Sequence, residues 1–245
     1  MSSRTDSCAV IIGSGPGIGA HAAAVFAAKR FNKVALVARN PAQLEKDAAT
    51  VSNAAPGKVQ VKTYSTDASD NVKLAKTLQQ IGEDIGSPEF VLYNAAVVAK
   101  STLLEFSEED ILRDFQISTI GLHVTAKWAV PQLVSIAKKD SAAKPTLMVT
   151  NSHLPENPVA DLFSLSLAKA AQKNLVRSLR QKFSTEGIHV CLLTVAGDVI
   201  ETQQYLNSTN IANKAWELYN QSKYAWTEDV RIEESSEAKI SDMEG

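Results

Sequence analysis

Four of the chain's eleven glycines fall within one seven-residue stretch, Gly13 to Gly19, in the segment IIGSGPGIG. The stretch follows a short apolar run and precedes an alanine-rich segment, which predicts a tight strand-to-helix turn. Glycines let the backbone of such a turn approach a ligand closely, and the N–H groups that begin the helix attract negative charge. The chemistry favoured by this pattern is binding of a pyrophosphate. The alternative is a glycine-rich turn without a ligand.

The residues that end the second apolar run indicate which pyrophosphate ligand to expect. The segment VALVARN places Ala38 and Arg39 nineteen and twenty residues after Gly19. A site that prefers NAD carries a carboxylate near this position for the ribose 2′-hydroxyl. Here the carboxylate is missing, and a guanidinium is suited to bidentate contact with a 2′-phosphate. We therefore expect NADP(H) as the cofactor; the alternative is a solvated arginine that ends an edge strand.

These residues need a scaffold, and short apolar runs that alternate with longer helical patterns predict parallel βαβ units. We expect strands at 8–12, 33–38, 58–64, 90–93, 146–150 and 189–195, with a short seventh at 230–232. We expect helices at 17–30, 41–53, 71–85, 108 to about 138, and 162–185. Right-handed crossovers then place helices on both faces of an open sheet. The predicted fold is a single-domain, Rossmann-type α/β fold with a doubly wound parallel sheet, and its ligand crevice lies at the carboxyl ends of the strands.

Composition and charge exclude several classes of function. The 245 residues are 44% hydrophobic and 21% charged, as in ordinary globular domains, and no apolar run approaches the length of a membrane span. The two cysteines make no disulfide framework, the four histidines lack metal-ligand spacing, and there is no basic block of the nucleic-acid kind. The N-terminus lacks the apolar core of a signal peptide, so we expect a cytoplasmic protein. Residues 1–232 form the expected domain, and the acidic residues 233–245 form an expected disordered tail.

From about residue 8 to residue 232, the chain resembles the short-chain dehydrogenase/reductase family. GSGPGIG is similar to the family's TGxxxGxG motif, and Asp67 in STDAS is similar to the aspartate that hydrogen-bonds the adenine. YNAA at 93–96 resembles the family's NNAG, Ser152 its catalytic serine, and Lys169 the lysine of its YxxxK motif. The resemblance implies that Lys169 binds the nicotinamide ribose and Ser152 orients a carbonyl. It places the cofactor against Gly13, Ser14, Gly17, Ile18, Gly19, Arg39, Asn40, Asp67, Ala68, Asn94, Ala95, Lys169, Val199 and Thr202.

The resemblance breaks at the family's proton donor. SLSLAK puts Leu165 where the YxxxK tyrosine would stand, and leucine neither donates nor accepts a proton. The helix asparagine that helps to hold a water beside the lysine in this family falls on Ser118. Ala196 replaces a proline after the sixth strand, and Thr202 stands one residue beyond the threonine usually near the nicotinamide carboxamide. Positioned acid catalysis contributes roughly 10²–10⁴-fold, so we expect slow carbonyl reduction with cofactor binding kept.

Four other residues are candidates for the missing acid/base. His153, next to Ser152, is the first candidate, because imidazole is the side chain most used for acid/base chemistry near neutral pH; the alternative is a solvent-facing loop histidine. Asp161 is the second, unless it only caps the helix expected from residue 162. Tyr93 and Tyr205 are candidates if they reach the crevice, and core packing is the alternative for each. The expected catalytic residues are Ser152, Lys169 and His153.

Three functions fit these residues. The first is an atypical NADP(H)-dependent oxidoreductase whose small-molecule substrate, such as a secondary metabolite with an iminium or an activated alkene, needs no tyrosine. The second is a non-redox isomerase or cyclase in which Leu165 is part of an apolar pocket wall. The third is a non-catalytic NADP(H)-binding protein. The resemblance also implies a homodimer or homotetramer formed through the helices expected at 108–138 and 162–185. We expect no metal, membrane or nucleic-acid partner.

Overall fold

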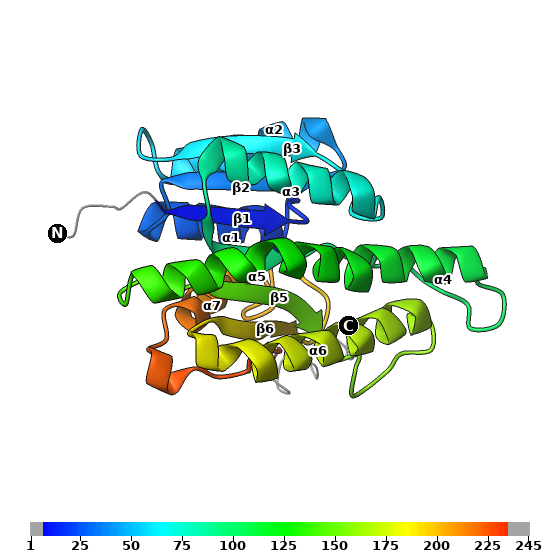
Figure 1. Ribbon diagram of the computed structural model, residues 1–245. Coiled ribbons are helices and arrows are strands. Elements are labelled where there is room, and N and C mark those ends of the chain that lie inside the picture. The colour runs from blue at the N-terminus through cyan, green and yellow to red at the C-terminus, as the bar shows by residue number, and fades with distance from the viewer. Residues whose placement is uncertain (1–6, 235–245) are drawn as a thin grey trace.

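Seven parallel strands form one continuous sheet in the order β3-β2-β1-β4-β5-β6-β7 (Figure 1). The computed structural model describes residues 7–234. Its strands are β1 (Cys8–Ile12), β2 (Lys33–Ala38), β3 (Gln60–Ser65), β4 (Pro88–Tyr93), β5 (Thr146–Ser152), β6 (His189–Val195) and β7 (Asp229–Ile232). The strand order changes direction between β1 and β4. Open α/β sheets bind ligands at such a switch point, outside the carboxyl ends of the strands.

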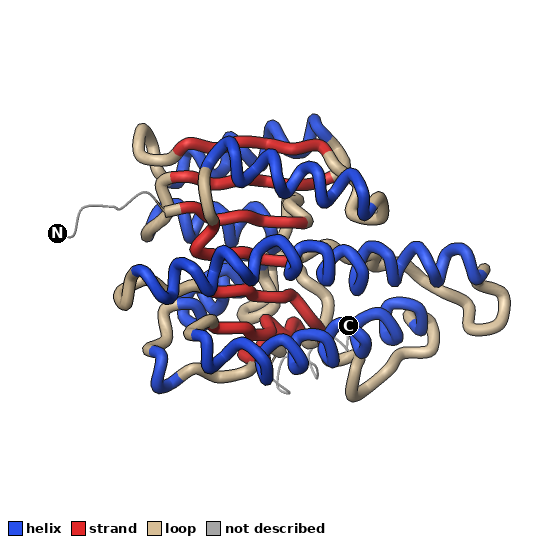
Figure 2. The backbone as a smooth tube through the Cα atoms, viewed as in Figure 1, coloured by secondary structure: helices blue, strands red, loops and turns tan. Residues whose placement is uncertain are grey.

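Helices cover both faces of this sheet and give the molecule three layers (Figure 2). On one face lie α1 (Ile18–Lys29), α2 (Pro41–Ala54) and α7 (Ser208–Tyr219). On the other lie α3 (Asn71–Ile85), α5 (Gly121–Lys139) and α6 (Phe163–Phe183). The shorter α4 (Glu108–Phe115) continues the direction of α5 past the ends of the strands (Figure 1), and the 3₁₀ turns η2 (Ser184–Glu186) and η3 (Lys223–Ala225) follow α6 and α7. The predicted doubly wound α/β sheet is confirmed.

An apolar core lies on each side of the sheet because the central strands are buried on both faces. Every residue of β1, β4 and β6 is buried, as expected for parallel strands between two helical layers. In the first core, Phe26 of α1, Phe90 of β4 and Tyr219 of α7 pack with ring centroids 4.1 to 5.5 Å apart. In the second core, Leu78 of α3 and Leu122 of α5 are fully buried. The two cores fix the carboxyl ends of β1 and β4.

The single helix predicted from residue 108 to about residue 138 is wrong, because a π-helical turn interrupts it. This turn, η1 (Gln116–Ile120), joins α4 to α5. Two side chains from distant parts of the sequence hydrogen-bond to it. The Tyr93 hydroxyl donates to the Ile117 carbonyl, and the Gln172 amide donates to the Ser118 carbonyl over 2.8 Å. Helical periodicity does not reveal such contacts, and π turns of this kind occur frequently at functional sites.

Helix α7 was not among the predicted helices, the last of which was expected at 162–185. Asn207 caps α7 by accepting a hydrogen bond from the Asn210 N–H over 2.8 Å. Ile211, Ala215 and Leu218 lie at helical spacing on its buried face. The helix provides the crossover that two parallel neighbours, β6 and β7, require.

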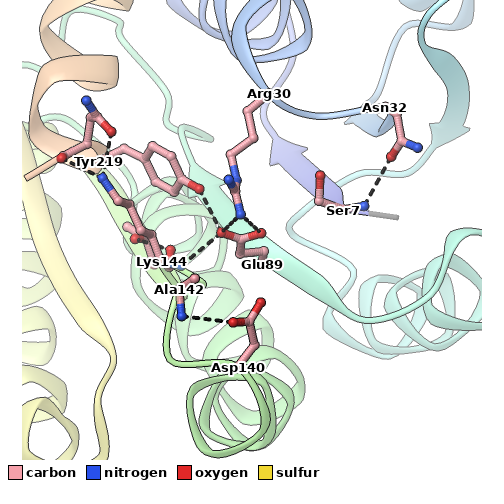
Figure 3. Close-up of polar contacts among 10 residues, drawn as sticks. Ser7, Arg30, Asn32, Glu89, Asp140, Ala142, Lys144 and Tyr219 are labelled. Carbon is pink, nitrogen blue, oxygen red and sulfur yellow. Dashed lines mark hydrogen bonds and ion pairs between the residues drawn. The ribbon is translucent and has the colours of Figure 1, made fainter. Parts of the chain in front are cut away.

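A buried carboxylate joins several segments at the amino-terminal edge of the sheet (Figure 3). Glu89 of β4 is 5% exposed and accepts two hydrogen bonds from Arg30, at 2.7 and 2.8 Å. It also accepts from the Tyr219 hydroxyl over 2.8 Å and from the Lys144 backbone N–H over 2.9 Å. Arg30 follows α1, Tyr219 ends α7, and Lys144 precedes β5. The carboxylate therefore ties three segments to β4.

The acidic tail predicted from Glu233 falls largely outside the described residues. Glu233 and Glu234 are described, and the Glu234 carboxylate accepts hydrogen bonds from the backbone N–H groups of Gln204, Tyr205 and Leu206 at 3.0 to 3.1 Å. Residues 235–245 lie beyond the described range. Among residues 7–234, no helix combines the length and the apolar character needed to cross a membrane.

Candidate cofactor cleft and active site

A cleft of about 370 Å³ lies at the carboxyl ends of β1, β2, β3 and β4. Its walls are the segments that follow these strands, together with Ile117 of η1. Eight of the predicted cofactor residues line it: Gly13, Ser14, Arg39, Asn40, Asp67, Ala68, Asn94 and Ala95. Lining residues absent from the predicted set include Gly15, Pro16, Gln43, Thr66, Ala96 and Val97. The cleft lies at the carboxyl ends of the strands, as predicted, and it lies where the strand order changes direction.

The glycine turn brings backbone to the surface of this cleft. Gly13 has a φ of +89°, and a Cβ there would lie 2.7 Å from the Cα of Ala95. Within α1, a Cβ on Gly19 would lie 2.7 Å from the carbonyl oxygen of Gly13. No atom lies within 4 Å of a Cβ built on Gly15, so this part of the turn faces open space. Only glycine fits the first two positions, and the resulting turn leaves room for a phosphate at the start of α1.

Ser14 is held by side chains that the sequence did not single out. Its hydroxyl donates to Oδ2 of Asp47 over 2.6 Å, and Gln43 donates to Oδ1 of the same carboxylate over 2.7 Å. The backbone N–H of Ser14 donates to the Val37 carbonyl over 3.0 Å. Because both donors of Ser14 are used within the protein, this residue shapes the turn and fastens it to α2.

Arg39 and Asp67 are neighbours in the lining of the cleft. Nη1 of Arg39 lies 4.0 Å from Oδ2 of Asp67, and the arginine side chain is 60% exposed. Ser69 donates its N–H and its hydroxyl to the other oxygen of Asp67, at 2.9 and 2.8 Å. Partial burial favours the protonated acid, but these hydrogen bonds and the charge of Arg39 outweigh it and lower the pKa of Asp67. Asp67 is therefore ionised at neutral pH, and the loosely paired guanidinium can turn toward an anion.

Two asparagines fix the backbone around the cleft. Asn40 caps α2 by accepting a hydrogen bond from the Gln43 N–H over 3.2 Å, and Pro41 follows it, which confirms the predicted helix start. Asn94 donates its side-chain amide to the Gly13 carbonyl over 2.9 Å. This contact ties the end of β4 to the end of β1, so the residues after both strands keep a fixed spacing.

Leu165 and Lys169 lie one helical turn apart on α6, and both are buried. Their exposed fractions are 6% and 5%. Nζ of Lys169 donates to the Thr150 carbonyl over 2.7 Å and to Oε1 of Gln172 over 3.0 Å. Burial lowers the pKa of Lys169 to about 8. A buried apolar side chain therefore lies one turn from a lysine that is bonded to neutral acceptors. That Leu165 stands where the family's proton donor would be remains a prediction from the sequence.

Ser152 and His153 stand at the carboxyl end of β5. The Ser152 hydroxyl accepts a hydrogen bond from the Leu154 N–H over 3.3 Å, which leaves its own O–H able to donate. His153 is half-buried rather than solvent-facing. Its Nδ1 is buried and makes no hydrogen bond to any residue in the range 7–234. No residue in this range therefore competes for the ring nitrogen, as the predicted acid/base role requires.

The other acid/base candidates have different surroundings. Tyr93 is fully buried and donates its hydroxyl to the Ile117 carbonyl, so it belongs to the core. Asp161 is exposed, and its alternative role as a helix cap is not found, because Leu162 occupies the N-cap position of α6. Tyr205 is 39% exposed in the segment between β6 and α7. All three lie outside the lining of the cleft.

The predicted site residues outside the cleft lining form two groups. Ser152, His153 and Lys169 gather where β5 ends beside α6. The other group consists of Gly17, Ile18 and Gly19 at the start of α1, and Val199 and Thr202 after β6. Ser208, which begins α7, has its Oγ 3.7 Å from the position of a Cβ on Gly17. The segment after β6 therefore returns to the glycine turn.

The residues around the cleft fit a dinucleotide. A turn that admits a phosphate lies at the start of α1, and an exposed guanidinium paired with an ionised carboxylate lies after β2 and β3. Thr66, Ala68, Ala95 and Val97 add small or apolar surface between them. Residues 7–234 hold no group of three His, Cys, Asp or Glu side chains arranged to bind a metal ion.

Comparison with known proteins agrees with this geometry. A family model described as short chain dehydrogenase matches residues 7–226. The chain is 27% identical over 125 residues to 17-beta-hydroxysteroid dehydrogenase 13 of Homo sapiens, a match covering 51% of this chain and 40% of that protein. The match thus spans less than half of that relative's length.

Two solved structures are similar in fold. The NADPH-bound short chain oxidoreductase from Pseudomonas aeruginosa PAO1, containing an atypical catalytic center, has a TM-score of 0.78 at 20% identity and covers 92% of this chain and 95% of its own. The NADH-dependent reductase A1-R′ complexed with NAD has a TM-score of 0.79 at 18% identity and covers 91% and 94%. These identities establish the fold alone. Because the family model extends over most of the sequence, from residue 7 to residue 226, the chain belongs to the short-chain dehydrogenase family.

Proposed function

We propose that this protein is an NADP(H)-dependent oxidoreductase that reduces a small molecule without a tyrosine acid. The observation that carries the proposal is the contrast between the two halves of the site. The glycine turn and Arg39 belong to a cleft suited to a dinucleotide, whereas the residue that the family resemblance aligns with the acid is Leu165, whose side chain is buried and apolar. Membership of the short-chain dehydrogenase family supports a nicotinamide cofactor.

The chain's own residues would hold the cofactor at several points. The backbone at the start of α1 binds the diphosphate, since Gly15 faces open space there. Arg39 binds the 2′-phosphate with two donors, because its contact with Asp67 is long, at 4.0 Å. Lys169 uses two of its three N–H groups within the protein and offers the third to a ribose hydroxyl. When bound, the reduced nicotinamide supplies a hydride.

The proposed substrate class follows from the missing proton donor. A ketone oxygen gains negative charge during reduction and needs a proton, which Leu165 does not supply. An iminium carbon that accepts a hydride becomes part of a neutral amine and needs no proton. An activated alkene becomes a carbanion stabilised by its neighbouring group and takes up a proton afterwards. For the alkene we propose His153, next to Ser152, as proton donor, because its Nδ1 is buried without a hydrogen-bond partner among the described residues.

Titration of the purified protein with NADPH, and with NADH in parallel, tests the proposed cofactor binding. Fluorescence or calorimetry gives the two affinities. We expect NADPH to bind more tightly than NADH. Arg39→Ala should weaken NADPH binding by roughly tenfold or more, with little effect on NADH. Arg177→Ala is the matched control, because Arg177 is 58% exposed and pairs with Glu228. A protein that binds neither nucleotide would overturn the proposal.

Turnover with candidate substrates tests the chemical half. We expect NADPH to be consumed with iminium ions or activated alkenes and much more slowly with simple ketones. Deuterium placed on one face of C4 of NADPH should appear in the product. If the protein rearranged its substrate while bound NADPH stayed unconsumed, the non-redox function would replace this one, with Leu165 as part of the pocket wall.

A further inference from the structure

A buried chain of hydrogen bonds runs from Lys169 to η1 through Gln172. Lys169 donates to Oε1 of Gln172 over 3.0 Å, and Nε2 of Gln172 donates to the Ser118 carbonyl over 2.8 Å. The exposed fractions of Lys169, Gln172 and Ser118 are 5%, 0% and 1%. The second acceptor of Lys169 is the Thr150 carbonyl in β5, 2.7 Å away. The chain therefore connects β5, α6 and η1 through buried polar groups.

The π-helical turn explains why the side-chain amide of Gln172 finds a carbonyl acceptor in η1. A π turn replaces regular α-helical hydrogen bonds, and its carbonyl groups then need other donors. In η1 the Tyr93 hydroxyl donates a hydrogen bond to the Ile117 carbonyl, and the Gln172 amide donates one to the Ser118 carbonyl. An unsatisfied buried carbonyl costs stability, so Gln172 has a reason to stay in one orientation. With Nε2 directed at Ser118, Oε1 is directed at Lys169.

We propose that Gln172 is a positioning residue that fixes Lys169 and sets its charge. Gln172 and the Thr150 carbonyl bind two of the three N–H groups of the lysine and leave one for a group that enters beside it. A side-chain amide gives and accepts hydrogen bonds without passing on a proton at neutral pH, and the chain ends on a carbonyl. The lysine is thereby kept for binding and orientation, with no proton path through Gln172.

The surroundings of Lys169 make Gln172 decisive for its charge. Burial lowers the pKa of the lysine to about 8, and the groups that contact the ammonium, from β5 and α6, are neutral. Charged groups on the packed elements have partners of their own. Asp114 of α4 accepts from Ser164 over 2.6 Å, and Lys173 pairs with Glu156. Each neutral acceptor that stabilises the ammonium therefore has a large share in keeping it protonated.

NMR titration of the full chain, with lysine carrying ¹³C at the ε-carbon, tests the proposal without any cofactor. Lys169 is identified as the signal missing from Lys169→Met. Gln172→Met keeps the volume of the side chain but removes its acceptor, and should lower the pKa of Lys169 by about one unit. Gln172→Glu keeps an acceptor, adds a charge, and should raise the pKa by about one unit or more.

Gln132→Met is the matched control. Gln132 of α5 also donates its amide to a backbone carbonyl, that of Trp128, over 3.0 Å, yet has no contact with Lys169. This variant should leave the lysine titration unchanged. If both Gln172 variants titrated like the parent protein, the proposal would be overturned. If Gln172→Met does not fold, Gln172→Glu alone tests the proposal. This variant should raise the pKa of Lys169, whereas simple loss of the acceptor would lower it.

A second measurement rests on the proposed function and separates it from the role of Gln172. At pH 8, the one-unit shift in Gln172→Met leaves about one lysine in ten charged instead of half, so NADPH affinity should fall about fivefold. At pH 6 both proteins carry a charged lysine, and their affinities should agree. A parent protein that does not bind NADPH would defeat the proposed function, while the lysine titration would still decide the role of Gln172.

Discussion

Leu165 and Lys169 together limit what the site can do to a bound substrate. The lysine is 5% exposed and bonded to two neutral oxygens, and the leucine one turn away carries no polar atom. Apart from the lysine, the nearby groups that can give a proton are at the end of β5. Ser152 keeps an O–H able to donate, and His153 has a buried ring nitrogen without a partner in the described chain.

Replacing Leu165 with tyrosine should create or raise reductase activity toward simple ketones. The hydroxyl would restore a proton donor one turn from Lys169, and positioned acid catalysis contributes roughly 10²–10⁴-fold. We expect a gain of at least about tenfold, measured as ketone-dependent oxidation of NADPH. Leu165→Phe adds the ring without the hydroxyl and should show no gain. A folded, NADPH-binding tyrosine variant with unchanged activity would mean that the pocket around residue 165 has diverged further.

The sequence predicted the place of several residues that line the cleft, because these residues directly follow predicted strands. Gly13, Arg39 and Asn40 follow the first two strands, so their place at the cleft could be read from spacing. Asp47 and Gln172 could not be predicted, because each is bonded to partners on other elements. The one signal for Gln172 was its spacing, three residues after Lys169 on a predicted helix, which puts both on one face.

At the scale of elements, local patterns predicted most bounds to within two residues, and the two failures, at η1 and at α7, have different causes. β1 and β6 were predictable because they are short apolar runs buried on both faces. The break at η1 depends on Tyr93 and Gln172, which periodicity does not include. α7 has a cap and an apolar face of its own, so the crossover rule applied to β6 and β7 would have predicted it.

His189, at the start of β6, should make the stability of the fold depend on pH. Its Nε2 lies 2.9 Å from the Thr227 carbonyl, and its ring stacks on Trp226 with centroids 4.9 Å apart. Burial lowers the pKa of His189 to about 4, against about 6.5 for an unfolded histidine. Between these values the unfolded chain binds more protons. The stabilisation is therefore complete above pH 6.5 and is lost as pH falls toward 4, by about 3 kcal/mol.

Urea unfolding at several pH values measures this effect. His189→Gln keeps a side-chain donor but does not titrate, so its stability should change less between pH 6.5 and pH 4 than that of the parent. His123→Gln, at an exposed position of α5, is the control and should keep the parent's pH profile. Equal slopes in the parent and His189→Gln would show that other groups cause the acid sensitivity.

At the scale of the whole molecule, the carboxyl and amino ends of the strands, here called the carboxyl edge and the amino edge of the sheet, contribute to different properties of the protein. The carboxyl edge carries the cleft, where side chains are partly exposed. The amino edge carries the Glu89 network, in which buried polar groups are bonded to one another (Figure 3). This separation allows stability and ligand binding to be changed independently.

Glu89→Ala should destabilise the protein by about 3 kcal/mol, because it leaves Arg30 and the Tyr219 hydroxyl without their acceptor. Glu89→Gln keeps an acceptor and should cost less. Glu217→Gln, which removes the charge from the exposed ion pair with Lys214, should change stability by less than about 1 kcal/mol. Urea unfolding gives these differences. NADPH affinity should stay the same in all three variants while they are folded, and a parallel loss of affinity would contradict the separation of the two edges.

The helical layer formed by α4, α5 and α6 is where we expect a second copy of the chain to bind. Leu112 of α4, Ile120 of η1 and Leu167 of α6 are 62%, 43% and 50% exposed. A groove between α5 and α6 adds apolar lining from Val130, Pro131, Val134, Leu179 and Phe183. Two such layers related by a two-fold axis would bury these side chains in a four-helix interface, giving a homodimer or, with a second interface, a homotetramer.

Sedimentation equilibrium of the purified protein, with charged substitutions, tests this assembly. Leu167→Glu places a charge in the expected interface, where burial of an unpaired carboxylate is costly, and should shift the protein to a smaller species. Leu104→Glu is the control, because Leu104 is 93% exposed in the loop before α4 and lies outside the helical layer. It should leave the mass unchanged. A parent protein that sediments as a monomer at micromolar concentration would contradict the prediction, and the exposed leucines would then need another explanation, such as contact with an apolar substrate.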